Sequence, residues 1–551
     1  MTDSFRFTPL SVLRAIPNGQ LYRSLLLGLL QTGLSIGWPL LIYRAIQPLP
    51  TAFDGPFFVE IAGIVVVFSL AQWLAWRQAF YNFAIIDAAC LRLSDKLYRQ
   101  LAGLQWLAFK QSKRAYLYDL LMSDFWRIRQ GISKLLDSVL ISTIIVLAML
   151  GFIAWLSTTM VIFCLVGMGL IALLGITTKQ KTRPLLVAFQ AAWRRQHGWA
   201  VALLDKFELF KMGRGVADTA AQHHDHTREF LSDNTRMLRE QLFWKSWLNW
   251  SGNVLRVATL FLGVYLIQSG ELSAQEFVLV LFLLSIIQSH IQPLSTALFS
   301  FMDAQEAAIT LDRFFRLPSE LKPTKSDREH EKAYSCATEP LKSIVLRNVC
   351  FSYPDKPVIE NKSLSLEQGN IYLWKGENGA GKSTMARILL GHLTPSAGEL
   401  CINGAPTPWP ELSLWRHQTA LIDQHVTLFG GTIKDNVLFG HPAAEQQWSD
   451  GDPELKRQLL PVQKDPENYQ VGECGGALSG GEARRIALLR ELYTNHTLLV
   501  LDEPTNHLDR TSINLLKRTI AQLKDDKIII IISHLDEFDD IADQTIKFTP
   551  C

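Results

Sequence analysis

The sequence predicts two differently built parts. We expect a membrane α-helical domain, with six transmembrane helices and long cytoplasmic extensions, over residues 1–318, and an α/β domain with a largely parallel sheet over residues 343–551. Two observations lead to this division: long apolar segments occur in the first part, and short β-rich runs that alternate with helical periods begin at Ser343. Residues 319–342 are polar and contain prolines, which is typical of a solvated linker.

Six segments of the first part approach the roughly 20 apolar residues that cross about 30 Å of hydrocarbon. Three short loops contain no Lys or Arg, whereas the two long segments between the other spans are rich in both. By the positive-inside rule, the long segments and both chain ends lie in the cytoplasm. We therefore expect a multi-pass membrane protein, with spans near residues 21–43, 57–77, 135–156, 159–177, 244–267 and 277–298.

The two long cytoplasmic segments, residues 77–134 and 178–243, mix apolar and charged residues and contain few Gly or Pro. Such segments are typical of helices that continue past the bilayer. A helix rises about 1.5 Å per residue, so each pair of extensions reaches some tens of Å before it turns back. We expect the turns near Lys113–Leu121 and Leu203–Lys211.

The net charge also differs between the two parts. Residues 1–318 carry 29 Lys and Arg against 20 Asp and Glu, a net charge of +9, whereas residues 319–551 carry 25 against 32, a net charge of −7. The total of +2 gives no basic bias that would favour nucleic acid as a partner. The seven cysteines lie far apart, so we expect neither a structural zinc site nor a disulfide framework.

A glycine-rich loop lies between a β-rich run and an apolar helix in the second part. The spacing G-x-x-x-x-G-K-[ST] in this context predicts a phosphate-binding loop. Its backbone N–H groups would point at phosphate, Lys382 would reach the β- and γ-phosphates, and the Ser383 hydroxyl can ligate Mg²⁺. The residues of this loop are Gly376, Glu377, Asn378, Gly379, Ala380, Gly381, Lys382, Ser383 and Thr384.

Two further motifs follow. The apolar run at residues 497–503 ends in two carboxylates, of which Asp502 would hold Mg²⁺ through water and Glu503 would orient and deprotonate an attacking water. Before it, a helix opens with Ser479, Gly480, Gly481 and Glu482. On its own this opening is either an anion site or a plain helix N-cap.

The order of these motifs resembles the nucleotide-binding domain of ATP-binding cassette (ABC) proteins. With six preceding spans, the chain resembles an exporter-type half-transporter, so that its second part would be an α/β P-loop NTPase (ABC ATPase) domain that binds ATP and Mg²⁺. The resemblance implies that Tyr353 stacks on adenine, Gln424 contacts Mg²⁺ and His534 contacts the γ-phosphate. It also implies that Ser479 to Glu482 complete the ATP site of the opposite subunit and that Asp509 belongs to the D-loop.

Two positions depart from the family's pattern. Glu482 stands where the signature usually has Gln, and Asn506-His507-Leu508-Asp509 stands where S-A-L-D is usual. The Ser and glycines of the signature make its phosphate contacts, so the first departure should preserve function. The family's ATP sites form between two nucleotide-binding domains, which makes a homodimer with two competent sites the simplest assembly and leaves a heterodimer open.

Polar side chains recur on single faces of the fifth and sixth predicted spans. Asn249, Asn253 and Arg256 follow one another at i, i+4 and i+7, and Gln288 and Gln292 do the same beside serines. These residues either line a water-filled cargo cavity at the dimer centre or hydrogen-bond one helix to another. Arg256 has no acid nearby on its own helix, which favours a cargo with an acidic or carbonyl-rich face.

The resemblance implies ATP-driven export from the cytoplasm across the lipid bilayer by alternating access. The predicted outer loops are short, and this compact form resembles bacterial exporters of small peptides, including modified ones. The resemblance implies a bacterial inner membrane as the location. Two alternatives remain open at this point: an exporter-fold importer of a metal chelate, and a membrane ATPase scaffold in peptide maturation.

Overall fold

The computed structural model divides into two compact units. We call residues 1–102 and 111–317 the helical unit and residues 103–110 and 318–551 the sheet unit. The predicted linker at 319–342 falls largely outside the described residues. The structure describes residues 8–9, 18–46, 55–204, 211–212, 216–320, 340–354, 356–423, 426–439, 448, 456, 459–460, 465, 468–492, 496–505 and 508–550.

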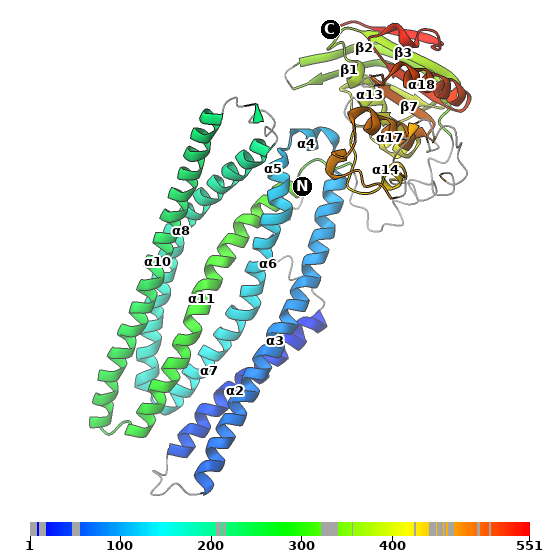
Figure 1. Cartoon of the computed structure of the whole chain (residues 1–551). Coiled ribbons are helices and arrows are strands. Elements are labelled where there is room, and N and C mark those ends of the chain that lie inside the picture. The colour runs from blue at the N-terminus through cyan, green and yellow to red at the C-terminus, as the bar shows by residue number, and fades with distance from the viewer. Residues whose placement is uncertain are drawn as a thin grey trace. The chain divides into compact units, whose positions relative to one another are not determined.

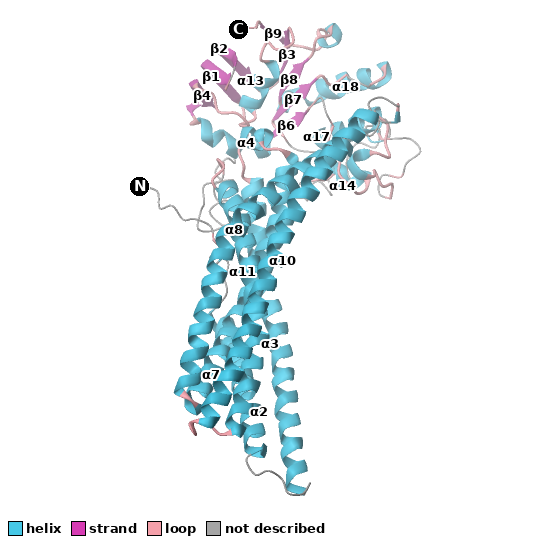
Figure 2. Ribbon diagram, turned by 90° about the vertical axis from the view of Figure 1, so that its left-hand side faces the viewer, coloured by secondary structure: helices cyan, strands magenta, loops and turns pink. Residues whose placement is uncertain are grey.

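The helical unit is a bundle of long helices in which α2 lies beside α3 and α8 beside α10 (Figures 1 and 2). Six helical segments of its described residues are long and apolar enough to cross a membrane, which confirms the predicted six-helix membrane domain. Its elements are α2 (Asn18–Ile46), α3 (Gly55–Ala102), α5 (Arg114–Asp119), η1 (Leu120–Asp124), α6 (Phe125–Lys134), η2 (Leu135–Leu140), α7 (Ile141–Leu156), α8 (Thr158–Leu204), α10 (Val216–Gln268) and α11 (Ala274–Phe315).

Small residues let these helices approach closely. A Cβ added at Gly167 of α8 would lie 2.4 Å from the Leu255 side chain of α10, and one added at Gly263 of α10 would lie 1.8 Å from the Phe277 ring of α11. Glycine therefore allows a close approach at both crossings, as is common between membrane helices. In contrast, only 6% of the most apolar window of α3 is buried, which leaves an apolar surface suited to lipid.

The first turn between the long helices lies earlier than the sequence predicts. α3 ends at Ala102, the short helix α4 (Trp106–Gln111) follows, and α5 begins at Arg114, so the predicted turn at Lys113–Leu121 is wrong. The Lys113 carbonyl already accepts from the Tyr116 and Leu117 N–H groups, which continues the helix through that range. The second turn is predicted at Leu203–Lys211. Helix α8 ends at Leu204, and residues 205–210 lie outside the described residues.

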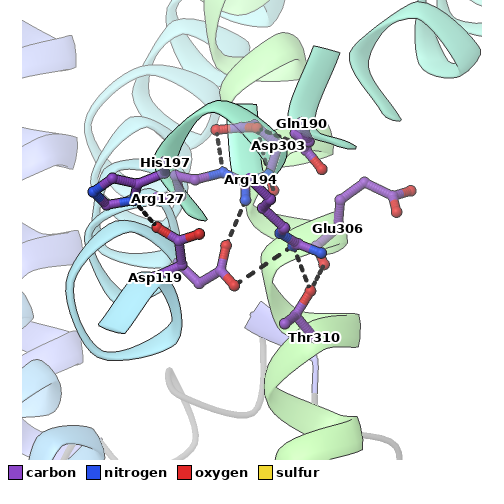
Figure 3. A network of polar contacts seen from close by, with 9 residues as sticks. Asp119, Arg127, Gln190, Arg194, His197, Asp303, Glu306 and Thr310 are labelled. Atoms are coloured by element: carbon purple, nitrogen blue, oxygen red, sulfur yellow. Dashed lines mark hydrogen bonds and ion pairs between the residues drawn. The ribbon is translucent and has the colours of Figure 1, made fainter. Parts of the chain in front are cut away.

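Charged side chains join three helices of the helical unit (Figure 3). Arg127 of α6 donates to Asp303 of α11 through Nη2 at 2.7 Å and Nε at 3.0 Å, and through Nη1 to Asp124 at 2.6 Å. Gln190 of α8 donates to the same Asp303 carboxylate at 2.8 Å, and Arg194 of α8 lies 3.7 Å from Asp124. Since Asp124 is buried and the groups around it are half-buried and joined by hydrogen bonds and ion pairs, they stabilise the relative positions of α6, α8 and α11.

The sheet unit contains an antiparallel sheet of order β2-β1-β4-β5 and a parallel sheet of order β6-β7-β8-β3-β9 (Figure 2). An α/β domain with a largely parallel sheet is therefore confirmed. Its strands are β1 (Ser343–Tyr353), β2 (Lys356–Glu367), β3 (Asn370–Gly376), β4 (Ala397–Ile402), β5 (Ala405–Pro406), β6 (Thr419–Ile422), β7 (Leu498–Asp502), β8 (Ile528–Ile532) and β9 (Gln544–Phe548). Its helices include α13 (Lys382–Leu389), η3 (Trp409–Gln418), α14 (Ile433–Val437), α17 (Gly480–Leu492) and α18 (Arg510–Leu523).

The register of the parallel sheet brings three strand ends to one edge. Ile532 of β8 pairs with Trp374 of β3 on one side and with Asp502 of β7 on the other. The segments that leave these strands therefore begin side by side, and the carboxyl edge of a parallel sheet is where ligands bind in such folds. All five residues of β8 are isoleucines and fully buried, which fits a central strand covered on both faces.

Candidate functional site

A pocket of about 540 Å³ opens at this edge of the parallel sheet. It is formed by the glycine-rich loop after β3, the two carboxylates at the end of β7, His534 after β8, and Tyr353 at the end of β1. Because the strands are neighbours, residues far apart in the sequence meet in one cavity. The lining residues are Tyr353, Lys356, Val358, Asn378, Gly379, Ala380, Gly381, Lys382, Ser383, Thr384, Asp502, Glu503, Ile532 and His534.

The glycines of the loop are required by its backbone. Gly379 and Gly381 both have φ near +87°, in the left-handed region that costs other residues about 1–2 kcal/mol. A Cβ at Gly376 would lie 2.3 Å from the Phe548 carbonyl oxygen of β9. Gly381 is the N-cap of α13, so the loop delivers the N–H groups of this helix terminus to the pocket, as an anion site needs.

Lys382, the first residue of α13, folds back over the loop. Its Nζ donates to the carbonyl oxygens of Gly376 at 2.6 Å and Glu377 at 3.0 Å. The side chain is 6% exposed, and burial lowers the pKa of Lys382 below its ordinary value, although the carboxylates of Glu503 and Asp502 oppose this. A phosphate in the pocket would offer this ammonium group a charged acceptor in place of the two carbonyls.

The two carboxylates differ in their surroundings. Burial raises the pKa of Asp502, while a hydrogen bond with the Ser383 side chain acts in the opposite direction. Glu503 has φ of +49°, and its Oε1 is buried and makes no hydrogen bond, although it lies 3.3 Å from Nε2 of His534. Burial raises the pKa of Glu503, and the neighbouring His534 lowers it. A buried carboxylate oxygen without a hydrogen bond can accept a proton from water.

Arg484 is a residue of this site that the sequence did not single out. It lies on α17, is 2% exposed, and donates through Nη2 to the carbonyl oxygens of Asp502 at 3.1 Å and Glu503 at 3.0 Å and through Nη1 to that of Asp423. It thereby holds the backbone that presents both carboxylates. In the sequence, the one indication of this role is that Arg484 lies about one turn into the helix that follows Ser479.

The signature segment forms a reciprocal cap at the start of α17. The Ser479 hydroxyl accepts from the Glu482 N–H at 3.3 Å, and the Glu482 carboxylate accepts from the Ser479 N–H at 2.7 Å. This is a capping box, in which Glu and Gln are interchangeable. The N-cap interpretation therefore holds within one chain, and at the helix terminus Gly480 is exposed and Gly481 is half-buried.

The other predicted nucleotide-site residues have mixed outcomes. Asp509 is the N-cap of α18, where its carboxylate accepts from the Ser512 N–H at 2.9 Å, and it does not line the pocket. Gln424, Asn506 and His507 lie outside the described residues.

The segment between α3 and α5 belongs to the sheet unit and carries an aromatic anchor. Trp106 of α4 stacks on His392, with ring centroids 6.2 Å apart and 2° between the planes, and the Arg387 guanidinium lies 4.9 Å from the Trp106 ring. Burial and the nearby Arg416 and Arg387 lower the pKa of His392 to about 4. His392 therefore stays neutral at physiological pH and packs as an aromatic ring.

Three of the five predicted cargo residues meet in the helical unit. Asn249, Arg256 and Gln288 line a cavity of about 260 Å³, to which residues of α8, α10 and α11 contribute. Asn253 lies beside it and accepts from Gln288 Nε2 at 3.2 Å, so both the cavity and the helix-to-helix hydrogen bond exist. The side chain of Gln292 is outside those that the structure describes.

Comparison with known proteins finds relatives of this chain among ABC proteins. The sequence model described as ABC transporter matches residues 359–506. The heterocyst differentiation ATP-binding protein HepA of Nostoc sp. is 24% identical over 521 residues, which cover 92% of this chain and 81% of that protein. The toxin RTX-I translocation ATP-binding protein of Actinobacillus pleuropneumoniae is 29% identical over 285 residues, 51% of this chain and 39% of that protein, so the chain matches well under two thirds of this relative.

The fold has a solved counterpart over nearly its whole length. A bacterial Atm1-family ABC exporter with ATP bound superposes with a TM-score of 0.81 at 19% identity, and the match covers 98% of this chain and 95% of that chain. Six long apolar helices precede the α/β domain in this chain. Residues 359–506 therefore carry the ATP-hydrolysing domain of an ATP-driven ABC transporter, and the chain as a whole is a multi-pass membrane protein with the exporter-type half-transporter fold.

Proposed function

We propose that the protein is a homodimeric ATP-driven exporter that moves a small peptide from the cytoplasm across a bacterial inner membrane. ATP hydrolysis is supported by one observation: Lys382, Asp502, Glu503 and His534 line the same pocket of about 540 Å³. The half-transporter fold supports the homodimer, because the described part of the chain holds one such set of residues and the family's ATP sites form between two nucleotide-binding domains. The peptide cargo is supported by the relative whose name assigns it translocation of toxin RTX-I.

At the ATP site, each side chain has a distinct role. Tyr353 stacks on adenine, the loop N–H groups and Lys382 hold the phosphates, and Glu503 orients and deprotonates the attacking water. His534, whose Nε2 lies 3.3 Å from the Glu503 carboxylate, contacts the γ-phosphate and keeps that carboxylate in place.

The residues present fit Mg²⁺. Ser383 and Asp502 offer hydroxyl and carboxylate oxygens, the donors this ion prefers, and the site needs only one or two protein ligands because the phosphates supply the rest. Gln424 is the third proposed ligand. When bound, the ion would neutralise charge on the β- and γ-phosphates.

Alternating access follows from pairing two chains. The signature segment from Ser479 to Glu482 of each subunit closes on the γ-phosphate at the other's glycine-rich loop, and Asp509 lies at the same dimer face. Trp106, which stacks on His392 within the sheet unit, transmits this closure to the helices that flank α4. Hydrolysis resets the dimer, and both chain ends stay in the cytoplasm.

Transport into inverted membrane vesicles tests the proposal. Vesicles with the parent chain receive ATP and a pool of radiolabelled small peptides on their outer side, which is the former cytoplasmic face, and vesicles with the Glu503→Gln variant serve as the matched control. ATP-dependent accumulation of a peptide that the variant does not accumulate supports export. Loss of label from preloaded vesicles would instead indicate import, and peptide-stimulated ATPase without movement in either direction would indicate a scaffold.

A further inference from the structure

The cavity in the helical unit has a polar wall and an apolar wall. α10 contributes Asn249, Gly252 and Arg256, α11 contributes Ser285, Gln288 and Ser289, and α8 contributes an isoleucine. At about 260 Å³ it is slightly smaller than a typical ligand pocket, so it accommodates one end of a larger molecule.

Arg256 lies deep in this part of the chain. It precedes the end of α10 at Gln268 by twelve residues, which corresponds to about 18 Å along a helix and to the middle of a hydrocarbon layer about 30 Å thick. Its Nε is buried and has no hydrogen-bond partner among the described residues. A charged side chain at this depth costs about 2.5–3.5 kcal/mol on insertion scales, so it is expected to serve a ligand or a partner.

The groups around Arg256 do not neutralise it. Within the described part of the chain, none of the residues that line the cavity is acidic. The hydroxyl hydrogens of Ser285 and Ser289 are donated to the carbonyl oxygens of Leu281 at 3.0 Å and Ile286 at 2.7 Å, inside their own helix. The cavity therefore presents a positive charge without a built-in counterion, which repels cations and attracts anions.

Gln288 adds a hydrogen-bond acceptor next to this charge. Its Nε2 donates to Asn253 Oδ1 at 3.2 Å, and this bond orients the amide so that Oε1 is buried without a partner. A Cβ at Gly252 would lie 3.3 Å from the Gln288 amide, so the glycine makes room for it. The site thus combines an unpaired cationic donor with an unpaired neutral acceptor.

We infer that this cavity binds a free carboxylate together with the N–H group next to it, as found at the C-terminal residue of a peptide. Arg256 pairs with the carboxylate, and Gln288 Oε1 accepts from the adjoining N–H. An ion pair is stronger in a region of low dielectric constant than in bulk water. The inference rests on the proposed function in that the ligand is the exported cargo, and it narrows that cargo to molecules with a free acid group.

The first test measures the sign of the potential in the cavity and needs neither cargo nor transport. The full-length chain, with its seven native cysteines replaced and Ser289→Cys added, is reconstituted in nanodiscs. The Ser289→Cys thiol reacts with an anionic sulfonatoethyl and a cationic trimethylammonioethyl methanethiosulfonate. Adding Arg256→Gln should lower the anion-to-cation rate ratio about tenfold, as expected for the loss of a nearby charge. Arg195→Gln, which removes a charge from the exposed pair with Glu229, should leave the ratio unchanged; equal ratios with and without Arg256 overturn the inference.

The second test uses small probes as competitors of the same labelling reaction. N-acetyl-leucine should slow modification of the Ser289→Cys thiol several-fold more than N-acetyl-leucinamide, and Arg256→Gln should abolish the difference. Gln288→Leu should remove the preference for N-acetyl-leucine over its 2-acetoxy ester analogue, which lacks the N–H. Equal protection by acid and amide overturns the inference even if vesicles export peptides, whereas protection by the acid alone upholds the site even if no export is found.

Discussion

Arg127 and Asp303 form a two-pronged ion pair between α6 and α11, with Nη2–Oδ1 at 2.7 Å and Nε–Oδ2 at 3.0 Å. The same guanidinium reaches Asp124, which is 2% exposed. Arg127 is thus the central residue of a network that also receives Gln190 and Arg194 from α8 (Figure 3). The network therefore connects α6, α8 and α11 through hydrogen bonds and ion pairs.

Asp303→Asn should destabilise the helical unit. The substitution removes the carboxylate that accepts from both Arg127 and Gln190, and such charge-assisted bonds contribute about 1–3 kcal/mol to stability. We expect a lower midpoint of thermal unfolding for the purified full-length chain. Arg195→Gln is the matched control because its partner Glu229 is half exposed, and exposed pairs contribute about 0–1 kcal/mol. Equal midpoints for the two variants would contradict a structural role for the network.

The cap at Ser479 predicts which substitutions of the signature are tolerated. Glu482→Gln should keep ATP hydrolysis within about twofold, because Gln also completes a capping box. Glu482→Ala should lower stability by about 1 kcal/mol. Ser479→Asn separates the two roles of this serine: Asn caps a helix well, so the midpoint of thermal unfolding should hold while ATP hydrolysis falls. If hydrolysis by Ser479→Asn matched the parent, Ser479 would be a cap and nothing more.

Glu503→Gln tests the assignment of the general base. General-base catalysis contributes about 10²–10⁴-fold, so steady-state ATP hydrolysis should fall at least about 100-fold. ATP should remain bound and hold the two subunits together, which size-exclusion chromatography with radiolabelled ATP can detect. Lys382→Ala is the comparison variant, because it should lose ATP binding itself. Turnover within a few-fold of the parent chain would refute the role of Glu503.

Glu491 makes the sheet unit sensitive to pH. Burial raises the pKa of this carboxyl from 4.5 to about 7, because α17 places it away from water. A raised pKa means that its contribution to stability is fully present below pH 4.5 and is lost as the pH rises through 7. Glu491→Gln, which is neutral at every pH, should therefore stabilise the chain at pH 8 by up to about 3 kcal/mol relative to the parent, and much less at pH 5. Thermal unfolding of both chains at the two pH values measures the difference, and an equal gain at both would exclude this carboxyl as the source.

Trp106→Ala should separate ATP hydrolysis from transport. The substitution removes the ring that stacks on His392 and lies under Arg387, while the ATP pocket is untouched. We expect basal ATPase within about twofold of the parent and loss of ATP-dependent accumulation in inverted vesicles. Trp106→Phe, which retains a stacking ring, should keep a large part of the transport. Normal transport by Trp106→Ala would show that α4 is not needed for coupling.

The strand ends and spanning helices could be predicted because their signals are local. Glycine spacing, apolar runs and loop charges each lie within a short stretch of sequence. The meeting of Lys382, Asp502 and His534 also follows once the strands are taken as neighbours in one parallel sheet. The sequence places Arg256 and Gln288 on the polar faces of two helices. Whether the two faces line a cavity depends on how α8, α10 and α11 pack together, which the sequence does not show.

Other features had no local signal. Arg484 acts through backbone carbonyls of two distant segments, and an arginine in a helix gives no hint of that. The network around Arg127 joins residues more than 170 positions apart. The turn before α5 was misplaced because residues 113–121 and the short helix α4 have the same helical composition as the long helices beside them.

The backbone conformation of Glu503 means that folding and ATP hydrolysis favour different residues at this position. Its φ of +49° lies in a region where Gly, Asn and Asp are comfortable and β-branched residues are not. A saturation library at this position, sorted once for membrane expression and once for growth that requires transport, should therefore give two different rankings. The first should enrich the residues that suit the left-handed turn, and the second should retain Glu almost alone. Residues that rank above Glu in the first selection but are lost in the second would show that Glu503 is kept for ATP hydrolysis and not for stability.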